Sequence, residues 1–310
     1  MNDLRHTARI EDDSLSSDRL LEHLWDWVVH PILKDLGLER NVQGEAQPHI
    51  TWCSTGPLTR VPLHAAGRYS EPNGPRAYNY VVSSYAPSLS AFSRATEGLA
   101  KKASTSSVLI VTQPETPGQR PLRGTLQESR RLCQLLDDSR MQRNVLNHER
   151  ATREAVRSAM NRHSWVHFAC HGSQRRNDPT KSAFHLYDGP LSLSDLMQTV
   201  SDNAELAFLS ACQTATGDVN NPEEAVHLAA GMLAVGFKGV VATMWSIGDA
   251  DAPVVVEAYY KKLLELRTTG AVGSGETGAA YALHEAVKIL RERVGEKNFF
   301  SWAPFVHFGV

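Results

Sequence analysis

The chain has 310 residues, a hydrophobic content of 42% and a formal net charge of −2 at pH 7. This length permits one large domain or two fused lobes, and the composition is sufficient for a sizeable hydrophobic core. Because both signs of charge are dispersed along the chain, the sequence lacks the basic footprint typical of proteins that bind nucleic acid or an anionic membrane.

The sequence carries no signal for membrane insertion or secretion. No apolar run reaches the roughly 18 residues that span a bilayer, and the first residues lack the apolar core of a signal peptide. The cysteines Cys53, Cys133, Cys170 and Cys212 are too few and too scattered for a disulfide framework. We therefore expect a cytoplasmic, reducing setting that keeps a thiolate available.

The N-terminal part of the chain predicts a helical segment and then a small α/β lobe. Apolar residues follow helical spacing over 18–38, and Pro31 should bend or divide this helix. Strands are predicted at 49–53 and 79–84, a returning hairpin arm at 58–63, and a helix at 90–101 capped by Ser88 or Ser90. A Ser/Thr-rich joint follows at 104–107. We expect an N-terminal helical segment at 1–48, a first lobe at 49–103 and a second lobe at 104–310.

Strands and helices alternate through the second lobe. Strands are predicted at 108–111, 145–146, 165–170, 183–187, 206–211, 238–245 and 305–308. Helices are predicted at 125–136, 152–160, 192–197, 222–235, 253–266 and 279–293. Thr125 and Glu128 have capping-box spacing, and Thr152 is placed to cap the helix that follows it. This alternation indicates βαβ units, and therefore an α/β fold with a mainly parallel sheet.

Two of the predicted strands end in reactive residues. The apolar run from Trp165 to Cys170 stops at His171-Gly172, and the run from Leu206 to Ala211 stops at Cys212. Ligands of open α/β sheets bind outside the carboxyl ends of the strands, so the two side chains are expected to face one crevice. A thiol beside an imidazole is the arrangement of a cysteine nucleophile with its base.

This pair would perform acyl transfer. His171 can take the proton of Cys212 and later protonate the leaving amine, while the backbone N–H groups of Gly172 and Cys212, expected in loops, are suited to an oxyanion hole. Gly172 also leaves room for a substrate backbone. The alternative is that Cys212 is a small buried hydrophobe, as many free cysteines are.

Ordered motifs along the chain carry a family resemblance. They are Val166-His-Phe-Ala-Cys-His171-Gly, Leu209-Ser-Ala-Cys212-Gln-Thr, the helix that begins Glu223-Glu-Ala-Val-His, and Val240-Val-Ala-Thr-Met-Trp245-Ser-Ile-Gly-Asp249. Upstream segments Leu58-Thr-Arg-Val-Pro-Leu-His64, Ser84-Tyr-Ala-Pro-Ser88 and Thr116-Pro-Gly118 also match. Over about residues 49–310 the chain resembles the CHAT domain, a family of caspase-like cysteine peptidases similar to separase. The resemblance implies a caspase-like α/β sandwich, a related degenerate lobe before it, and His171 and Cys212 as the dyad.

Asp249 is the candidate for substrate selection. It follows the strand predicted at 238–245 and should face the same crevice. A carboxylate in a pocket selects a cationic side chain by charge-assisted hydrogen bonds. In separase-like enzymes the acidic residue of the matching Trp-x-x-x-Asp segment serves the P1 arginine pocket, which makes Asp249 the S1 candidate and Asp251 the runner-up. The alternative role for Asp249 is to cap the next helix.

We expect neither a metal nor a cofactor. His163, His167 and His171 recur every four residues, but on a strand this spacing holds them roughly 13 Å apart, too far to share one ion. His167 is then structural, and Cys170 packs on the opposite face. The run Gly273-x-Gly-x-x-Gly278 matches the dinucleotide fingerprint only in letters, because it follows a predicted helix rather than a strand.

The sequence thus predicts a cysteine endopeptidase that cleaves after Arg or Lys. The alternative is a non-catalytic CHAT-type scaffold or signalling module. Expected partners are a protein or peptide substrate, and possible ones are TPR-type helical repeats or a regulatory protein, but not nucleic acid or a membrane. No segment repeats with a period of about 34 residues, so we expect the chain to be either a C-terminal fragment or a stand-alone domain.

Overall fold

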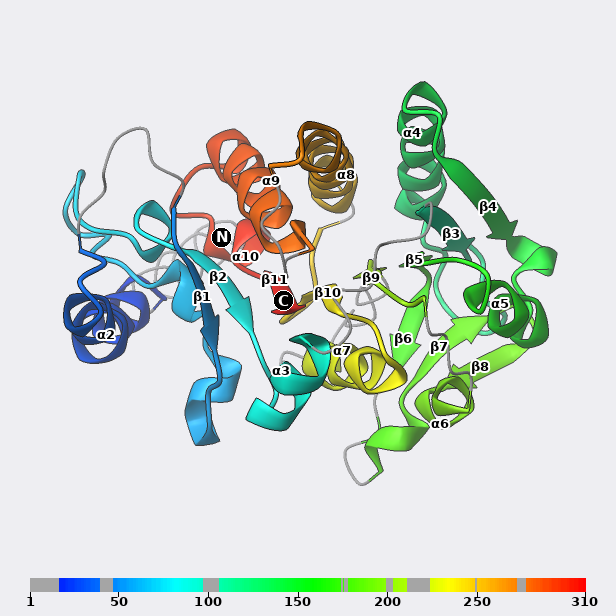
Figure 1. Ribbon diagram of the computed structural model, residues 1–310, viewed down its shortest axis with the longest axis horizontal. Helices are drawn as coiled ribbons and strands as arrows, with labels where there is room; N and C mark the ends of the chain where they lie inside the picture. Colours follow the sequence, from blue (N-terminus) through cyan, green and yellow to red (C-terminus); the bar gives the residue numbers. More distant parts are fainter. Residues whose placement is uncertain are drawn as a thin grey trace, which may run out of the picture.

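A single eight-stranded sheet runs through the computed structural model of the protein (Figure 1). The structure describes residues 17–39, 47–96, 106–173, 175, 178–198, 203–210, 224–248, 250–271 and 277–310. The strand order is β1-β2-β11-β10-β9-β5-β3-β4. The strands are β1 His49–Trp52, β2 Val82–Tyr85, β3 Ser107–Thr112, β4 Gln142–Asn147, β5 Trp165–Ala169, β9 Leu206–Leu209, β10 Gly239–Thr243 and β11 Phe305–Gly309.

The sheet divides into two parallel blocks. Strands β4, β3, β5, β9 and β10 run in one direction. Strand β11 is antiparallel to β10, and β2 and β1 run parallel to β11. The central strands β5, β9 and β10 are fully buried, which explains why their sequences are continuous apolar runs rather than alternating ones.

Helices cover both faces of the sheet. One layer contains α4 Gly124–Asp138, α8 Ala252–Thr269 and α9 Ala279–Val294, and the other contains α3 Leu89–Thr96 and α7 Glu224–Val235 (Figure 1). Further helices are α5 Arg153–Met160, α6 Leu193–Met197 and α10 Phe299–Trp302. Within the described residues, the helices and the sheet enclose one continuous apolar core. The molecule is therefore an α/β sandwich with a mainly parallel central sheet, as predicted.

The N-terminal helix changes its winding ahead of Pro31. Residues 17–24 are α-helical, Trp25–Val29 form a π-helical turn, and α2 spans His30–Asp35 with Pro31 in its first turn. Proline cannot donate the backbone hydrogen bond that a continuous α-helix needs there. Pro31 nevertheless does not divide the helix, which stays helical from residue 17 to Asp35, although its winding changes to a π-turn just before the proline.

A second, three-stranded sheet follows β5. It consists of β6 His171–Ser173, β7 Ala183–Leu186 and β8 Gly189–Ser192, all antiparallel. Helix α6 begins directly after it with a capping box between Ser192 and Asp195. The sequence predicted only a hairpin-like segment here, and the third strand begins at the candidate base itself.

Two local predictions are wrong. Residues 58–63 do not return as a hairpin arm, because 3₁₀ turns occupy Gly56–Arg60 and Leu63–Ala65 and β1 pairs in parallel with β2 instead. Thr125 and Glu128 form no capping box. Helix α4 already begins at Gly124, the Thr125 hydroxyl donates to the carbonyl of Leu122, and Glu128 is buried with other partners.

Other local predictions are confirmed. Thr152 caps α5 by accepting from the amide of Ala155, and the amide of Ala91 donates to Ser88 at the start of α3. Residues 49–103 contribute β1 and β2 to the same sheet as residues 104–310 through the contact of β2 with β11. The division of the chain into lobes stays a prediction. Among the described residues, every helix is too short or too polar to cross a bilayer.

Candidate active site

The two strands that precede the candidate dyad lie side by side. Strands β5 and β9 are parallel neighbours, and Phe168 pairs with Leu209 at their carboxyl ends. His171 follows Phe168 by three residues, and Cys212 follows Leu209 by three. Cys212 itself lies outside the described residues, as does Asp249. The parallel neighbourhood of the two strands is confirmed, whereas the sulfur–imidazole distance stays a prediction.

The imidazole of His171 is buried and held in one orientation. Its Nε2 atom lies 2.7 Å from the backbone carbonyl oxygen of Arg120. A carbonyl can only accept, so Nε2 carries the proton and Nδ1 of the neutral ring is an acceptor. Nδ1 is also buried and has no hydrogen-bond partner among the residues that the structure describes. Within the described part of the chain, Nδ1 is thus an acceptor without a donor, which is the arrangement that a candidate general base needs.

The loop after β3 delivers the carbonyl of Arg120. The amide of Gln113 donates to the carbonyl of Ala169 over 2.9 Å, which ties the start of this loop to the end of β5. The amide of Leu122 donates to Pro114 over 2.7 Å and closes the loop on itself. The sequence did not indicate Arg120, because the contact is made by its backbone carbonyl, which every residue type has.

Unpaired polar atoms gather at this edge of the sheet. Within the described residues, eight buried side-chain nitrogen or oxygen atoms have no hydrogen-bond partner. Six of them belong to Thr112, Gln113, Thr116, His171, Thr243 and Ser246, which lie at or just after the carboxyl ends of β3, β5 and β10. Buried polar groups are normally paired, so this concentration among the described residues makes this edge of the sheet the candidate site.

Gly172 lies in a strand and not in the expected loop. It is the middle residue of β6 and pairs with Phe184, while His171 pairs with His185.

The strand partner of His171 is neutral. Burial, and after it the neighbouring His171 and Arg175, lower the pKa of His185 below its usual value. His185 is therefore neutral at pH 7 and adds no positive charge beside His171. The role of Gly172 in an oxyanion hole remains untested.

Asp251, the runner-up for the S1 pocket, begins α8. It occupies the N-cap position, yet its carboxylate accepts no capping hydrogen bond from the helix. Its amide donates to the carbonyl of Gly248 over 3.0 Å, so the loop after β10 closes tightly in front of the helix. The side chain is half-buried at the same edge of the sheet as His171.

The remaining histidines of the His run have separate partners. His163 contacts the carbonyl of Ala159, and His167 contacts Glu128, both at 2.7 Å. Over the described ranges no group of three His, Cys, Asp or Glu side chains is placed to hold a metal ion. His167 and Cys170 are buried, in agreement with their predicted packing roles. Most of the Gly273–Gly278 run lies outside the described residues.

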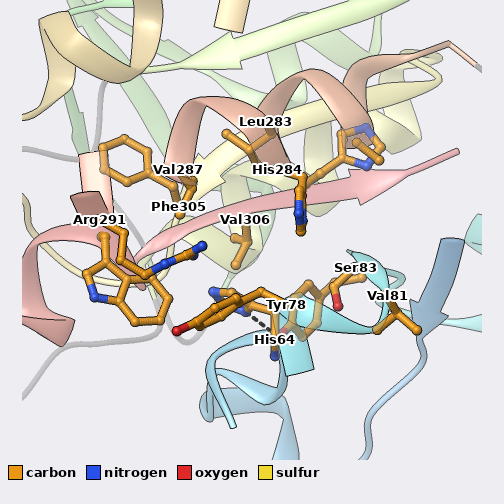
Figure 2. Close-up of a pocket in the computed structure, with 14 residues that line it drawn as sticks. His64, Tyr78, Val81, Ser83, Leu283, His284, Val287, Arg291, Phe305 and Val306 are labelled. Carbon is orange, nitrogen blue, oxygen red and sulfur yellow. Dashed lines mark hydrogen bonds between the residues drawn. The ribbon is translucent and has the colours of Figure 1, made fainter. Parts of the chain in front are cut away.

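A cavity lies on the other half of the sheet, between β2, β11 and α9 (Figure 2). His64 and Tyr85, from two of the upstream motif segments, meet there. The Tyr85 hydroxyl donates to His64 Nδ1 at 2.7 Å, and His64 Nε2 donates to the carbonyl of Ala303 at 3.0 Å. The guanidinium of Arg291 stacks 3.5 Å from the centroid of the Tyr78 ring. These motif segments therefore join β2 to the C-terminal region rather than forming the dyad.

The buried histidines of this cavity, His64 and His284, should make the stability of the fold depend on pH. Burial, and then the nearby Arg291, lower the pKa values of His64 and His284 from 6.5 to about 4. Because the unfolded chain binds these protons first, the stabilisation is complete above pH 6.5 and is lost as the pH falls toward 4. Each histidine should contribute about 3 kcal/mol over that window. Urea unfolding at several pH values should show the free energy of unfolding falling in this range.

A control variant separates the contribution of these histidines to the pH dependence from that of carboxylates that titrate in the same pH range. His284→Gln should reduce the slope of unfolding free energy against pH, whereas substitution of the exposed His23 by Gln is the matched comparison. Identical slopes in wild type and His284→Gln would contradict the assignment.

The fold defines the class of protein: a caspase-like α/β scaffold with a mainly parallel central sheet. Residues 18–310 match the CHAT domain, and the chain belongs to that family. The structure is similar to gingipain R, described as an Arg specific cysteine proteinase, with a TM-score of 0.52 and 16% identity over 75% of this chain and 55% of that chain. It is also similar to the complex of Porphyromonas gingivalis RgpB pro- and mature domains, with a TM-score of 0.58 and 14% identity over 90% of this chain and 68% of that chain.

A curated relative shows how the domain occurs in a longer protein. The chain is 27% identical over 197 residues to tetratricopeptide repeat protein 28 of Mus musculus. This match covers 51% of the chain but spans only 8% of the length of that relative. The family and the protease-like scaffold follow from these comparisons.

Proposed function

We propose that the protein is a cysteine endopeptidase that cleaves peptide bonds after a basic residue. The observation that carries this proposal is the state of His171, whose Nε2–H donates to the Arg120 carbonyl and whose buried Nδ1 has no hydrogen-bond partner among the described residues. The sequence places a cysteine just past the end of the neighbouring parallel strand. A base oriented by a third group beside a thiol is the arrangement that nucleophilic catalysis requires.

In the proposed reaction His171 carries two protons in turn, the first from the thiol to the leaving amine and the second from water to sulfur. His171 Nδ1 takes the proton of the Cys212 thiol, and the thiolate attacks the peptide carbonyl carbon. The carbonyl electron pair becomes an oxyanion, for which the amides of Gly172 and Cys212 are the proposed donors. When the tetrahedral species collapses, the C–N bond breaks and the leaving amine takes the proton from Nδ1. A water molecule then gives a proton to His171 Nδ1 and its oxygen attacks the acyl carbon of the thioester. The C–S bond breaks, the acid product leaves, and the sulfur takes the water-derived proton from Nδ1.

The proposed specificity for a basic P1 residue rests on carboxylates at the edge of the sheet where His171 lies. Asp249 is the proposed S1 residue and Asp251 the second candidate. The half-buried carboxylate of Asp251, which caps no helix amide, lies after the parallel strand β10 and supports the presence of negative charge in this region. A similar structure belongs to a proteinase described as Arg specific. A pocket carboxylate would pair with Arg bidentately and with Lys through a single ammonium.

Selective labelling should distinguish an enzyme from a scaffold. A peptidyl electrophile with Arg at P1 is expected to capture Cys212 roughly 10-fold or more faster than the exposed Cys53 at pH 7, because the base raises the thiolate fraction. His171→Ala should remove this preference. Peptide mapping by mass spectrometry measures both sites in the same sample.

Cys53 serves as the internal control, since any general increase in reagent reactivity raises both rates. Equal labelling of Cys53 and Cys212 in the wild type would count against catalysis. That outcome would favour the alternative of a CHAT-type interaction module whose partners include TPR-type repeats or a regulatory protein. The match to a repeat protein supports this alternative.

A further inference from the structure

A buried carboxylate ties together the two strands that precede the candidate dyad. Glu128 of α4 has an exposed fraction of only 1%, and it accepts two hydrogen bonds. One comes from Nε2 of His167 on β5, at 2.7 Å, and the other from the hydroxyl of Ser210, at 3.1 Å. Ser210 directly follows β9. The two oxygens of one side chain therefore hold two different strands.

The position of these contacts along the chain relates them to the site. His167 precedes His171 by four residues, and Ser210 precedes Cys212 by two. His167 and Phe208 are register partners on β5 and β9, and their rings stack with centroids 5.2 Å apart. The cluster thus lies across the β5–β9 pair immediately before both strands end.

Burying this polar cluster has a free-energy cost that an apolar cluster would avoid. His167 and Ser210 are 0% and 2% exposed, so all three polar side chains are removed from water. Taking an ionised carboxylate out of water is costly, and well-packed apolar residues often serve stability equally well. The hydroxyl of Tyr260 on α8 lies 3.4 Å from Nδ1 of His167, so α8 as well as α4 contacts the cluster.

The cluster is not a second hydrolytic centre. The Ser210 hydroxyl donates to the Glu128 carboxylate and not to the ring of His167, so these three residues do not form the Ser–His pair of a serine hydrolase. Its near-complete burial also leaves a substrate no approach. Its function must therefore act through other residues.

We propose that Glu128 is a positioning residue for the dyad, fixing the ends of β5 and β9 so that the His171 imidazole and the Cys212 sulfur meet. This inference rests on the proposed function. One carboxylate links the two strand ends. A mutation away from the reacting atoms that shifts them slightly can still lower the reaction rate strongly. The cluster therefore matters for reactivity beyond its part in folding.

The test measures Cys212 reactivity directly. In the full chain, the rate of Cys212 alkylation by iodoacetamide is followed by peptide mapping across pH 5–9, together with kcat and KM for an Arg-P1 peptide. Glu128→Gln and Ser210→Ala are each expected to slow alkylation at pH 7 and to lower kcat by about 10-fold or more, with KM little changed. Because both variants break the same contact, the double variant should lose less than the product of the single losses.

A matched control separates positioning from general destabilisation. Glu296 is another carboxylate with long-range partners, accepting from Arg76 at 3.0 Å and from the Tyr78 hydroxyl. Glu296→Gln should lower the melting temperature without changing the alkylation profile of Cys212. If Ser210→Ala folds and its profile and kcat equal those of the wild type, the positioning role is wrong.

The experiment also separates this inference from the proposed function. A wild-type Cys212 that reacts at the rate of an ordinary exposed thiol overturns the dyad, and the positioning role with it. An activated wild-type Cys212 whose reactivity and kcat survive in a folded Ser210→Ala or in a folded Glu128→Gln overturns the positioning role alone.

Discussion

Cys212→Ala is expected to abolish cleavage of an Arg- or Lys-P1 peptide while the fold is retained. The substitution removes the proposed nucleophilic sulfur, and loss of a catalytic nucleophile costs about 10⁴-fold or more in kcat. His171→Ala should lose activity to a similar degree, because the two residues act as one unit whose individual losses do not multiply. Rates are measured with a fluorogenic peptide, and circular dichroism checks the fold.

Two cysteine variants are the controls for this experiment. Cys53→Ala and Cys133→Ala change an exposed and a half-buried thiol away from the ends of β5 and β9, and full activity is expected in both. Undiminished cleavage by Cys212→Ala would reject the nucleophile assignment and leave the interaction module as the better account.

Asp249→Ala is expected to remove the preference for a basic P1 residue. Two charge-assisted hydrogen bonds to an arginine side chain contribute about 3 to 6 kcal/mol, so kcat/KM for Arg at P1 should fall roughly 10²- to 10⁴-fold. Cleavage after uncharged residues should change little, because those residues do not use the carboxylate. A positional-scanning peptide library with wild type and variant measures the whole P1 profile.

Asp251→Ala is the matched variant, since it removes a second carboxylate two residues away. A lost basic preference in Asp251→Ala with an unchanged profile in Asp249→Ala would transfer the S1 role to Asp251. Unchanged profiles in both variants would show that neither carboxylate selects the substrate.

Local sequence patterns predicted much of the fold. The apolar runs that became β5, β9 and β10 are buried on both faces, so their composition alone indicates central strands. The caps of α5 by Thr152 and of α3 by Ser88 were predicted because a capping side chain contacts an amide only a few residues away. Interactions of this range are encoded in adjacent residues.

Predictions failed where distant segments competed for the same groups. Glu128 has capping-box spacing, yet two donors from β5 and β9 take its carboxylate instead. Residues 58–63 follow β1 closely enough for a hairpin, but β2 occupies that edge in parallel. The segment after His171 leaves the main sheet as β6, which pairs with β7 twelve residues further on.

The sequence by itself determined the residue types, their order and the α/β class of this protein, because hydrophobic periodicity and turn chemistry act over a few residues. The tertiary structure decided which strands are neighbours, that Arg120 orients the candidate base, and that Glu128 links β5 to β9. Those contacts join residues 39 to 82 positions apart. Such contacts depend on how the whole sheet packs, and no spacing within a single segment specifies them.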